Sequence, residues 1–434
     1  MDVLLKYLSL EDPNVRYVVI AIVLLAGMSG TVGCFNFLRK KTLVGETVAH
    51  SMLPGVLIAF LLSGVKNPAV MILGATVSGW MSIWVVDYIT QRSKIKGDSA
   101  LAIVLSSFFG LGIVLLTMIQ SRYVGNQSGL DHYIFGNAAA MTPSDSIAFA
   151  SVSLVVLGLI IASYWSVKAI IFNSDYAQSI GISRKKIETL ISVITILTIS
   201  VGIKAVGIVM MSALLIIPPT AARFWTDRLV PMLIISGIFG SLGGWIGAFV
   251  SYSQTNMPTG PWTIVSVSII AFVSMLFAPR KGIVYQRWNK LLLRRRINEE
   301  NLLKAAVQNE VRGKGKLFTR ETINQRQFFE PNLWNRTVGR LNTKGLIRSV
   351  HGGYTLSTAG RTYGADIDRR HKIWEVYLQR RMQMSVHLVH DEAETMEHFL
   401  TPEIEEEILR ELGLCSRFNP LLEIHEIIPD PDLV

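Results

Sequence analysis

The sequence predicts an all-α polytopic membrane domain of about nine transmembrane helices, followed by a smaller cytosolic domain that is mainly α-helical. Two observations lead to this fold class. Apolar segments long enough to cross a bilayer recur as far as residue 278, and the charged residues of that part gather in the loops between them. Beyond residue 285 the long apolar segments stop, and patterns typical of water-soluble helices replace them.

The predicted membrane domain covers residues 1–285. Each of its apolar segments holds roughly 20 residues, which is the length that spans the hydrocarbon core as a helix. The segments lie at residues 17–37, 43–63, 69–90, 99–120, 146–164, 187–203, 206–224, 229–252 and 262–278. Glycines repeat along several of them, as expected where helices pack closely in lipid.

Basic loops predict the orientation of this domain. They lie at residues 39–41, 92–96, 168–186, 223–228 and 280–281, and all fall on one side if the segments alternate. Because positively charged loops face the cytoplasm, we expect a multi-pass inner-membrane protein with an external N-terminus and a cytoplasmic C-terminal domain. Much of the net charge of +10 therefore belongs to membrane loops and does not by itself indicate nucleic-acid binding. The two cysteines provide no disulfide framework.

Residues 43–55, LVGETVAHSMLPG, place two ionisable side chains inside a membrane segment. Glu46 and His50 are four residues apart, so on a helix they share a face and can bind the same divalent cation. Pro54 and Gly55 can break the helix and free backbone carbonyl oxygens, which lipid tolerates only beside a cavity or in a protein interior. A buried polar pair that only ties two helices together is the alternative, but ionisable groups within a membrane usually mark a functional site.

Residues 173–182 form a short amphipathic segment between two basic stretches, too polar to cross the membrane. Asp175 and Ala177 lie within it, and Gly181 ends it. The pattern predicts a short cytoplasmic helix, either a docking element or a plain interfacial helix with a glycine C-cap.

The soluble part begins with a basic juxtamembrane linker at residues 286–298, which suits contact with anionic membrane lipid. Helices are predicted at 299–312, 320–327 and 332–344, and residues 346–356 alternate around a Gly-Gly turn typical of a β-hairpin. Three helices and a hairpin predict a winged-helix domain at residues 299–365. Three basic side chains repeat every four residues along its third helix, and either contact DNA phosphates or form a solvated basic face: Arg336, Arg340 and Lys344.

The final region, residues 366–434, is predicted to be helical and to bind metal. Its ligand-type side chains have helical spacing, first as a pair and then along one face: His371, Glu375, His390, Glu394, Glu397 and His398. Imidazole and carboxylate groups on neighbouring helices can form one or two metal sites. A salt-bridged surface is the alternative, although three histidines at this spacing favour metal.

Residues 1 to about 285 resemble the permease subunit of ABC transporters for manganese, zinc and iron. The resemblance rests on the 43–55 motif, the 175–181 loop, LIIPPTAAR at 215–223, and MPTGP at 257–261 with APR at 278–280. It implies that Glu46, where the family usually has Asp, contacts the transported metal together with His50. It also implies that residues 175–181 are the coupling helix, which docks on a cytosolic ATPase, and that a second permease copy or a paralogue completes the pathway.

Residues from about 299 to 412 are similar to metal-dependent regulators of the diphtheria-toxin-repressor type. The similarity rests on the winged helix, RHKIWE at 370–375 and VHDEAETMEH at 389–398. It implies that residues 366–434 form a metal-binding and dimerisation region. One metal site is then expected at His371, Glu375 and His390, and a second at Glu394, Glu397 and His398. Manganese-type members carry a carboxylate at the position of Glu394, whereas iron-type members carry Cys. In the first helix Glu300 aligns with a family ligand, but Leu303 stands where manganese sensors have a second acid.

These features predict the permease subunit of an ABC importer for a divalent transition metal, Mn²⁺ in preference to Fe²⁺ or Zn²⁺, with a C-terminal domain that binds Mn²⁺ or Fe²⁺. The chain has no GxxxxGK[ST] phosphate-binding loop, so it is not expected to bind nucleotide or act as an enzyme; a partner ATPase hydrolyses ATP. An extracytoplasmic metal-binding protein is the other expected partner. The alternative is a metal-dependent DNA-binding repressor, tethered to the membrane or released by proteolysis.

Overall fold

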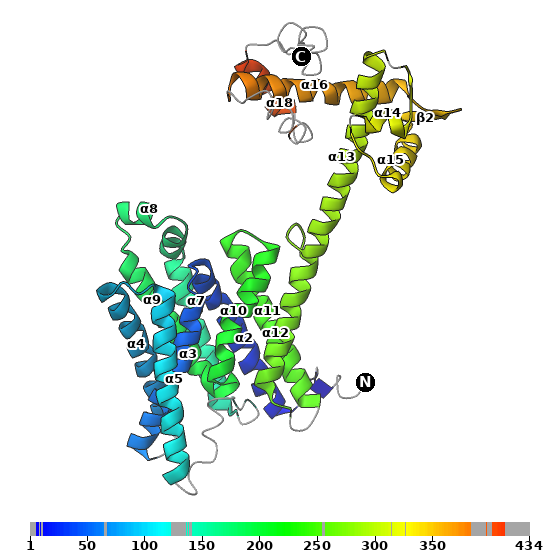
Figure 1. Cartoon of the computed structure of the whole chain (residues 1–434). Helices are drawn as coiled ribbons and strands as arrows, with labels where there is room; N and C mark the ends of the chain where they lie inside the picture. The colour runs from blue at the N-terminus through cyan, green and yellow to red at the C-terminus, as the bar shows by residue number, and fades with distance from the viewer. Residues whose placement is uncertain are drawn as a thin grey trace. The chain divides into compact units, whose positions relative to one another are not determined.

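The computed structural model describes residues 6, 7, 9, 12–64, 67–122, 136, 138, 141–253, 257–313, 315–325, 327–382, 396 and 402–412. The chain divides into two compact units, Met1–Gln286 and Arg287–Val434. The first unit is a helical bundle (Figure 1). Its helices are α2 (Pro13–Leu38), α3 (Leu43–Ser63), α4 (Pro68–Arg92), α5 (Gly97–Arg122), α7 (Pro143–Phe172), α8 (Ser174–Ser179), α9 (Arg184–Val206), α10 (Ile208–Trp225), α11 (Leu229–Ser253) and α12 (Thr259–Phe277).

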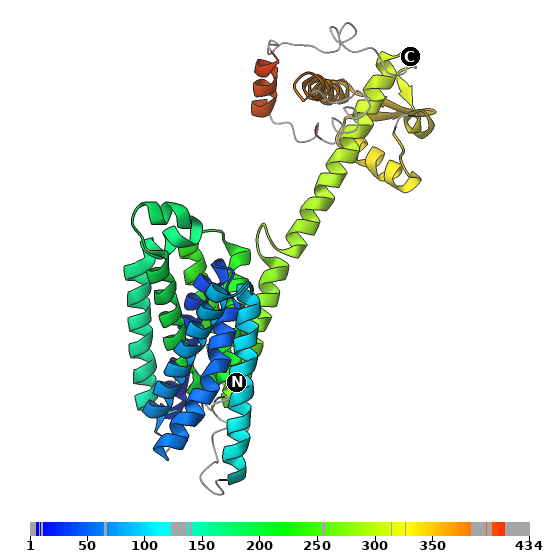
Figure 2. The same ribbon diagram turned by 60° about the vertical axis from the view of Figure 1, so that its left-hand side comes forward.

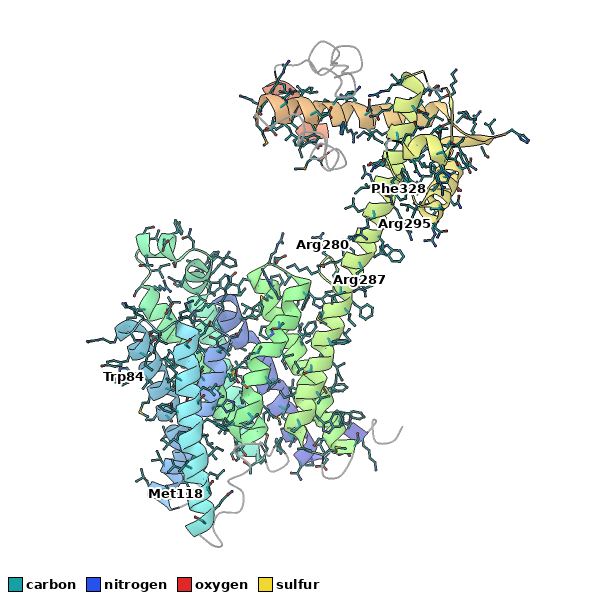
Figure 3. The ribbon with its side chains drawn as sticks, in the orientation of Figure 1. Trp84, Met118, Arg280, Arg287, Arg295 and Phe328 are labelled. Atoms are coloured by element: carbon teal, nitrogen blue, oxygen red, sulfur yellow. The ribbon has the colours of Figure 1, made fainter. Side chains whose placement is uncertain are left out.

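Within the described residues, nine of these helices are long and apolar enough to cross a membrane, as predicted. Only α8 is too short. The outer surface of the bundle is apolar: Leu154 and Trp165 of α7 are each 75% exposed. Figure 3 shows Trp84 of α4 and Met118 of α5 pointing away from the bundle. Large apolar side chains on the outside are expected where lipid, not water, surrounds the helices.

Polar caps set the starts of several spanning helices. Asp12 accepts a hydrogen bond from the backbone N–H of Asn14 at 2.9 Å, one residue before Pro13 begins α2. Asn67 caps α4 in the same way, with Pro68 as its first residue. Proline suits this position because its missing N–H would have no helical partner there. Gly207, at φ 91°, separates α9 from α10, whose predicted segments, 187–203 and 206–224, have only two residues between them.

Close approaches between helices hold α3 in the bundle. A Cβ atom added at Gly55 would lie 2.2 Å from the carbonyl oxygen of Gly74 on α4, so glycine is required at this crossing. The helix break predicted at Pro54 is wrong, because α3 continues from Leu43 to Ser63 with Pro54 inside it. Helix α10 likewise continues through Pro218 and Pro219. Packing against neighbouring helices allows proline inside membrane helices.

The second unit begins within α13 (Ile283–Val311), a continuous helix that includes the predicted linker and the first helix of the winged-helix domain. The next elements are β1 (Leu317–Phe318), α14 (Arg320–Asn324), α15 (Pro331–Thr343), β2 (Ile347–Val350), β3 (Gly353–Leu356), α16 (Thr358–Arg380) and α18 (Pro402–Glu411). The strands form an antiparallel sheet in the order β1-β3-β2. The predicted hairpin is β2 and β3; the two-residue strand β1 was not predicted.

The core of this unit forms where α15 packs on the sheet and on α13. Trp334 of α15 is buried, and its ring lies within 6.4 Å, centre to centre, of the rings of Phe318, Phe329 and Tyr354. Leu303 of α13 is fully buried in the same cluster. These contacts fix α15 and the start of α16 against α13, and so position the predicted DNA-contacting and metal-binding side chains.

Candidate metal pathway and metal-binding region

Glu46 and His50 lie one turn apart in α3 and are both partly buried. Helix α3 packs most extensively against α4 and α5. The imidazole of His50 meets the ring of Phe109 of α5 edge to face, with the ring centres 4.8 Å apart. Between the two ligand-type residues, Thr47 donates a hydrogen bond to the backbone oxygen of Leu101 on α5 at 3.4 Å. These contacts hold one face of α3 against α5 and orient the His50 ring.

His50 has two atoms that can donate an electron pair to a cation, the ring Nδ1 and the backbone carbonyl oxygen. Its Nδ1 is buried and has no hydrogen-bond partner within the described part of the chain. Its carbonyl oxygen also lacks the usual helical donor four residues on, because Pro54 has no N–H. A buried polar atom without a partner is costly unless a ligand satisfies it. The carboxylate of Glu46, the His50 ring and the His50 carbonyl are therefore suitable ligands for a divalent cation.

The predicted cytoplasmic helix is α8, which lies at the end of the bundle where α9 begins (Figure 1 and Figure 2). Asn173 caps it by accepting a hydrogen bond from the N–H of Tyr176 at 3.0 Å. Ala177 is fully buried, whereas Asp175 and Tyr176 are exposed. Gly181 follows the helix at φ 86°, where a side chain would be strained. The small side chain of Ala177 therefore packs α8 against the bundle. The polar face of α8 stays exposed and can contact a partner.

A cluster of charges beside α8 was missed by the sequence analysis. The carboxylate of Glu188 in α9 lies 3.0 Å from the guanidinium of Arg184 and 3.5 Å from both Arg39 and Lys41. Arg39 and Lys41 belong to the turn that leads into α3. The cluster borders a cavity of about 1000 Å³, whose wall also includes Asp87 of α4. Charge alone could not reveal this cluster, because Glu188 is 147 residues from Lys41.

In the second unit His371 and Glu375 are brought together as a pair on α16, with His371 Nε2 3.0 Å from Glu375 Oε1. The other ring nitrogen, Nδ1, lies 2.9 Å from Nζ of Lys304 on α13. Glu300, one turn before Lys304, accepts hydrogen bonds from Tyr363 at 2.6 Å and from Arg296 at 2.7 Å. Burial and the neighbouring Glu300 raise the pKa of Tyr363 to about 12. Each of these ligand-type groups therefore has protein partners.

The other four predicted ligands, His390, Glu394, Glu397 and His398, lie outside the described residues. Among the residues that the structure does describe, no group of three or more His, Cys, Asp and Glu side chains is placed to hold a metal ion.

Of the three basic residues predicted to contact DNA, two have an intramolecular partner. Arg340 donates a hydrogen bond to Glu299 of α13 at 2.7 Å, and Lys344 donates to the same carboxylate at 2.5 Å. Arg336 is exposed on α15. Glu299 therefore neutralises part of the basic face that the sequence spacing predicted.

Comparison with known proteins identifies the membrane unit. Residues 11–278 match the ABC 3 transport family, and these residues make up more than half of the chain. The chain belongs to the ABC 3 transport family. It is thus a multi-pass membrane transport protein, and the resemblance predicted for residues 1 to about 285 is confirmed.

Relatives of known name resemble this ABC 3 chain over much of its length. The manganese transport system membrane protein MntC of Bacillus subtilis is 35% identical over 380 residues, which cover 87% of each chain. The zinc transport system membrane protein TroC of Treponema pallidum is 35% identical over 291 residues, covering 67% of this chain and 97% of TroC. Among solved structures, PsaBC from Streptococcus pneumoniae in complex with Fab has 27% identity and a TM-score of 0.58, covering 66% of this chain and 99% of that chain.

Part of the second unit of this ABC 3 chain matches a different family model. Residues 357–420 match the metal binding and dimerisation domain of the iron dependent repressor, which confirms the second predicted resemblance. The similarity to MntC, at 380 residues, is longer than the 286 residues of the membrane unit and so extends into the second unit. The similarity to that relative is therefore not confined to the membrane unit.

Proposed function

We propose that this chain is the permease subunit of an ABC importer that carries Mn²⁺ into the cell, with Fe²⁺ and Zn²⁺ as further candidate substrates. Glu46 and His50 receive the ion. Helix α8, through Asp175, Ala177 and Gly181, docks on a cytosolic ATPase subunit that supplies the energy. A second permease copy or a paralogue completes the pathway, and an extracytoplasmic metal-binding protein delivers the ion. The second unit lies in the cytoplasm.

The observation that carries this proposal concerns the buried Nδ1 of His50, which has no hydrogen-bond partner among the described residues and lies one turn from Glu46 within a spanning helix. An imidazole there is costly without a ligand, and a cation satisfies it and the carboxylate together. Carboxylate and carbonyl oxygens favour Mn²⁺ and similar hard cations, whereas the imidazole also accepts Fe²⁺ and Zn²⁺. The names of the relatives MntC and TroC, a manganese and a zinc transport protein, support the same substrate class.

Uptake of radioactive manganese by proteoliposomes that hold the chain and its ATPase tests the site. We expect Glu46→Gln and His50→Gln each to lower uptake at least about tenfold, since loss of an outer-sphere partner alone costs 10- to 100-fold in metal affinity. His351→Gln, which changes an exposed histidine of the β2–β3 turn, is the matched control and should transport normally. Normal uptake by the Glu46 and His50 variants would refute the assignment.

For the second unit we propose feedback: cytosolic Mn²⁺ or Fe²⁺ binds ligands of this unit, among them His390, Glu394, Glu397 and His398, and lowers transport. Their helical spacing and the matched metal-binding domain support this. Removal of the second unit should abolish inhibition of uptake by internal metal. Transport that stays equally sensitive to internal metal would contradict the feedback function.

The second candidate function is metal-dependent DNA binding by the winged-helix domain. The exposed Arg336 on α15 favours it. Binding to a duplex that requires metal and weakens steeply with salt would support this function. Absence of binding at low salt would exclude it.

A further inference from the structure

Three side chains form a continuous hydrogen-bonded chain between α13 and α16. Lys304 Nζ lies 2.9 Å from His371 Nδ1, and His371 Nε2 lies 3.0 Å from Glu375 Oε1. Lys304 is 8% exposed and His371 is 2% exposed, so water does not separate them. The two ends of this chain are a cation and an anion, and the imidazole connects them.

The chemistry of Lys304 determines which ring nitrogen of His371 carries the proton. An ammonium group has three donors and no acceptor, so Nδ1 must accept and cannot carry a hydrogen. The neutral ring then has its hydrogen on Nε2, which donates to the Glu375 carboxylate. In this tautomer both nitrogens are engaged. A metal-binding histidine instead needs one nitrogen lone pair free for the metal and an acceptor, not an ammonium, beside its other N–H.

Neighbouring contacts continue the same connection along both helices. One turn before Lys304, Glu300 accepts a hydrogen bond from Tyr363 of α16 at 2.6 Å. One turn after it, Gln308 donates to Asp368 of α16 at 2.6 Å. Polar side chains therefore join α13 to α16 at three successive turns of α13, and Lys304 lies at the middle turn. Protein groups supply the connection that a metal ion bound at His371 would otherwise provide.

We propose that Lys304 takes the place of a metal ion at His371, so that α13 and α16 stay joined whether or not metal is present. The His371–Glu375 pair is then a structural contact, and the metal response of this unit arises from other ligands. This inference is independent of the transport function, because it concerns side chains of the second unit alone.

Metal content of the purified full-length chain tests the proposal. Equilibrium dialysis against Mn²⁺ and, separately, Zn²⁺, followed by elemental analysis, gives the number of ions per chain. We expect His371→Gln to bind as many ions as the unmodified chain. A lower number, or an affinity at least tenfold weaker for one ion, would overturn the proposal.

A change at Lys304 tests directly whether this lysine keeps a metal ion from binding His371. A glutamine at position 304 has a carbonyl oxygen that can accept a hydrogen bond from Nδ1–H of His371. In that tautomer the lone pair of Nε2 is free to bind a metal ion. Lys304→Gln should therefore bind one additional ion, and the double variant with His371→Gln should lose it again. If the Lys304→Gln chain gains no ion, Lys304 is not what keeps metal from His371, and the proposal is contradicted.

Two lysine variants serve as controls for this experiment. Lys304→Arg keeps the charge and the donors, and Lys316→Gln removes an exposed lysine of the same unit; neither should gain an ion. If Lys304→Gln fails to fold by thermal unfolding, the comparison of His371→Gln with the unmodified chain still decides the proposal.

Discussion

Glu299 determines how much positive charge α15 presents to solvent. Its carboxylate accepts from Arg340 and Lys344, and the side chain of Glu299 is only 9% exposed. A carboxylate held between two cations weakens their attraction for DNA phosphates, because each would have to give up a charge-assisted hydrogen bond. A single residue of α13 thus limits the DNA affinity of the face that the sequence spacing predicted.

Replacement of Glu299 by glutamine should release this basic face. Each additional cation that contacts a phosphate steepens the dependence of log K on log salt by about 0.9, so two released cations should steepen it by about 2. Fluorescence anisotropy of a labelled duplex, titrated with the full-length chain at several salt concentrations, measures that slope.

Glu310→Gln is the matched control for this titration. It makes the same charge change on the same helix but releases Arg361 of α16 instead of the two cations Arg340 and Lys344. Equal slopes for the two variants would show that Arg340 and Lys344 do not contact DNA.

At the scale of elements, the crossing of α3 and α4 at Gly55 and Gly74 places the Glu46 and His50 helix within the bundle. The added Cβ of an alanine at Gly55 would meet backbone of Gly74, which cannot move aside as a flexible side chain can. Helices that approach this closely tolerate only the smallest residues.

Gly55→Ala should therefore destabilise the membrane unit by about 1–3 kcal/mol, the usual cost of overpacking. Thermal unfolding in detergent measures the change. Gly110→Ala on α5 is the control, because no atom lies within 4 Å of the added Cβ. This control should be neutral or stabilising by up to about 1 kcal/mol, since alanine favours helix over glycine. Equal melting temperatures for the two variants would contradict the role of the crossing.

The spanning helices could be predicted because hydropathy is a local property. For α3 the predicted limits, 43 and 63, are those of the helix itself. Strand β1 could not be predicted, because two residues show no alternation and depend on their pairing with β3. The predicted break at Pro54 failed for a similar reason: packing by neighbouring helices determines whether a proline interrupts a membrane helix.

In the candidate sites, contacts between residues close in the sequence could be predicted, whereas contacts between residues far apart could not. The spacing of Glu46 and His50, and of His371 and Glu375, follows from helical periodicity and could be predicted. The pairing of Lys304 with His371 joins residues 67 positions apart, and that of Arg340 with Glu299 joins residues 41 apart. No spacing rule reaches that far, so the partners of the predicted ligands required the folded structure.

At the scale of the whole molecule, the Glu188 cluster connects two parts of the membrane unit with different roles. Glu188 lies near the start of α9, just beyond α8, and its ion pairs with Arg39 and Lys41 reach the turn that leads into α3. If α8 docks on an ATPase subunit as proposed, we expect its displacement to reach, through this cluster, the helix that carries Glu46 and His50.

Glu188→Gln should weaken the link between the start of α9 and the turn before α3. It leaves both the proposed docking helix α8 and the proposed metal ligands Glu46 and His50 unchanged. Loss of a partly exposed ion-pair cluster costs about 1 kcal/mol, which is about fivefold in a two-state equilibrium. We expect metal uptake per ATP hydrolysed to fall by about that factor in proteoliposomes. Asp98→Asn, at an exposed carboxylate in the first turn of α5, should leave the ratio unchanged. An unchanged ratio for Glu188→Gln would show that the cluster does not transmit movement.

The presence of both units on one polypeptide fixes their stoichiometry: every permease is synthesised with its own regulator region. If two copies form the pore, two dimerisation regions become tethered neighbours, and their effective concentration is on the order of millimolar however few molecules the cell holds. Pairing of the regulator regions then becomes a unimolecular step. Its extent would depend on metal occupancy rather than on expression level, so a cell with a few transporters would respond at the same metal concentration as a cell with many.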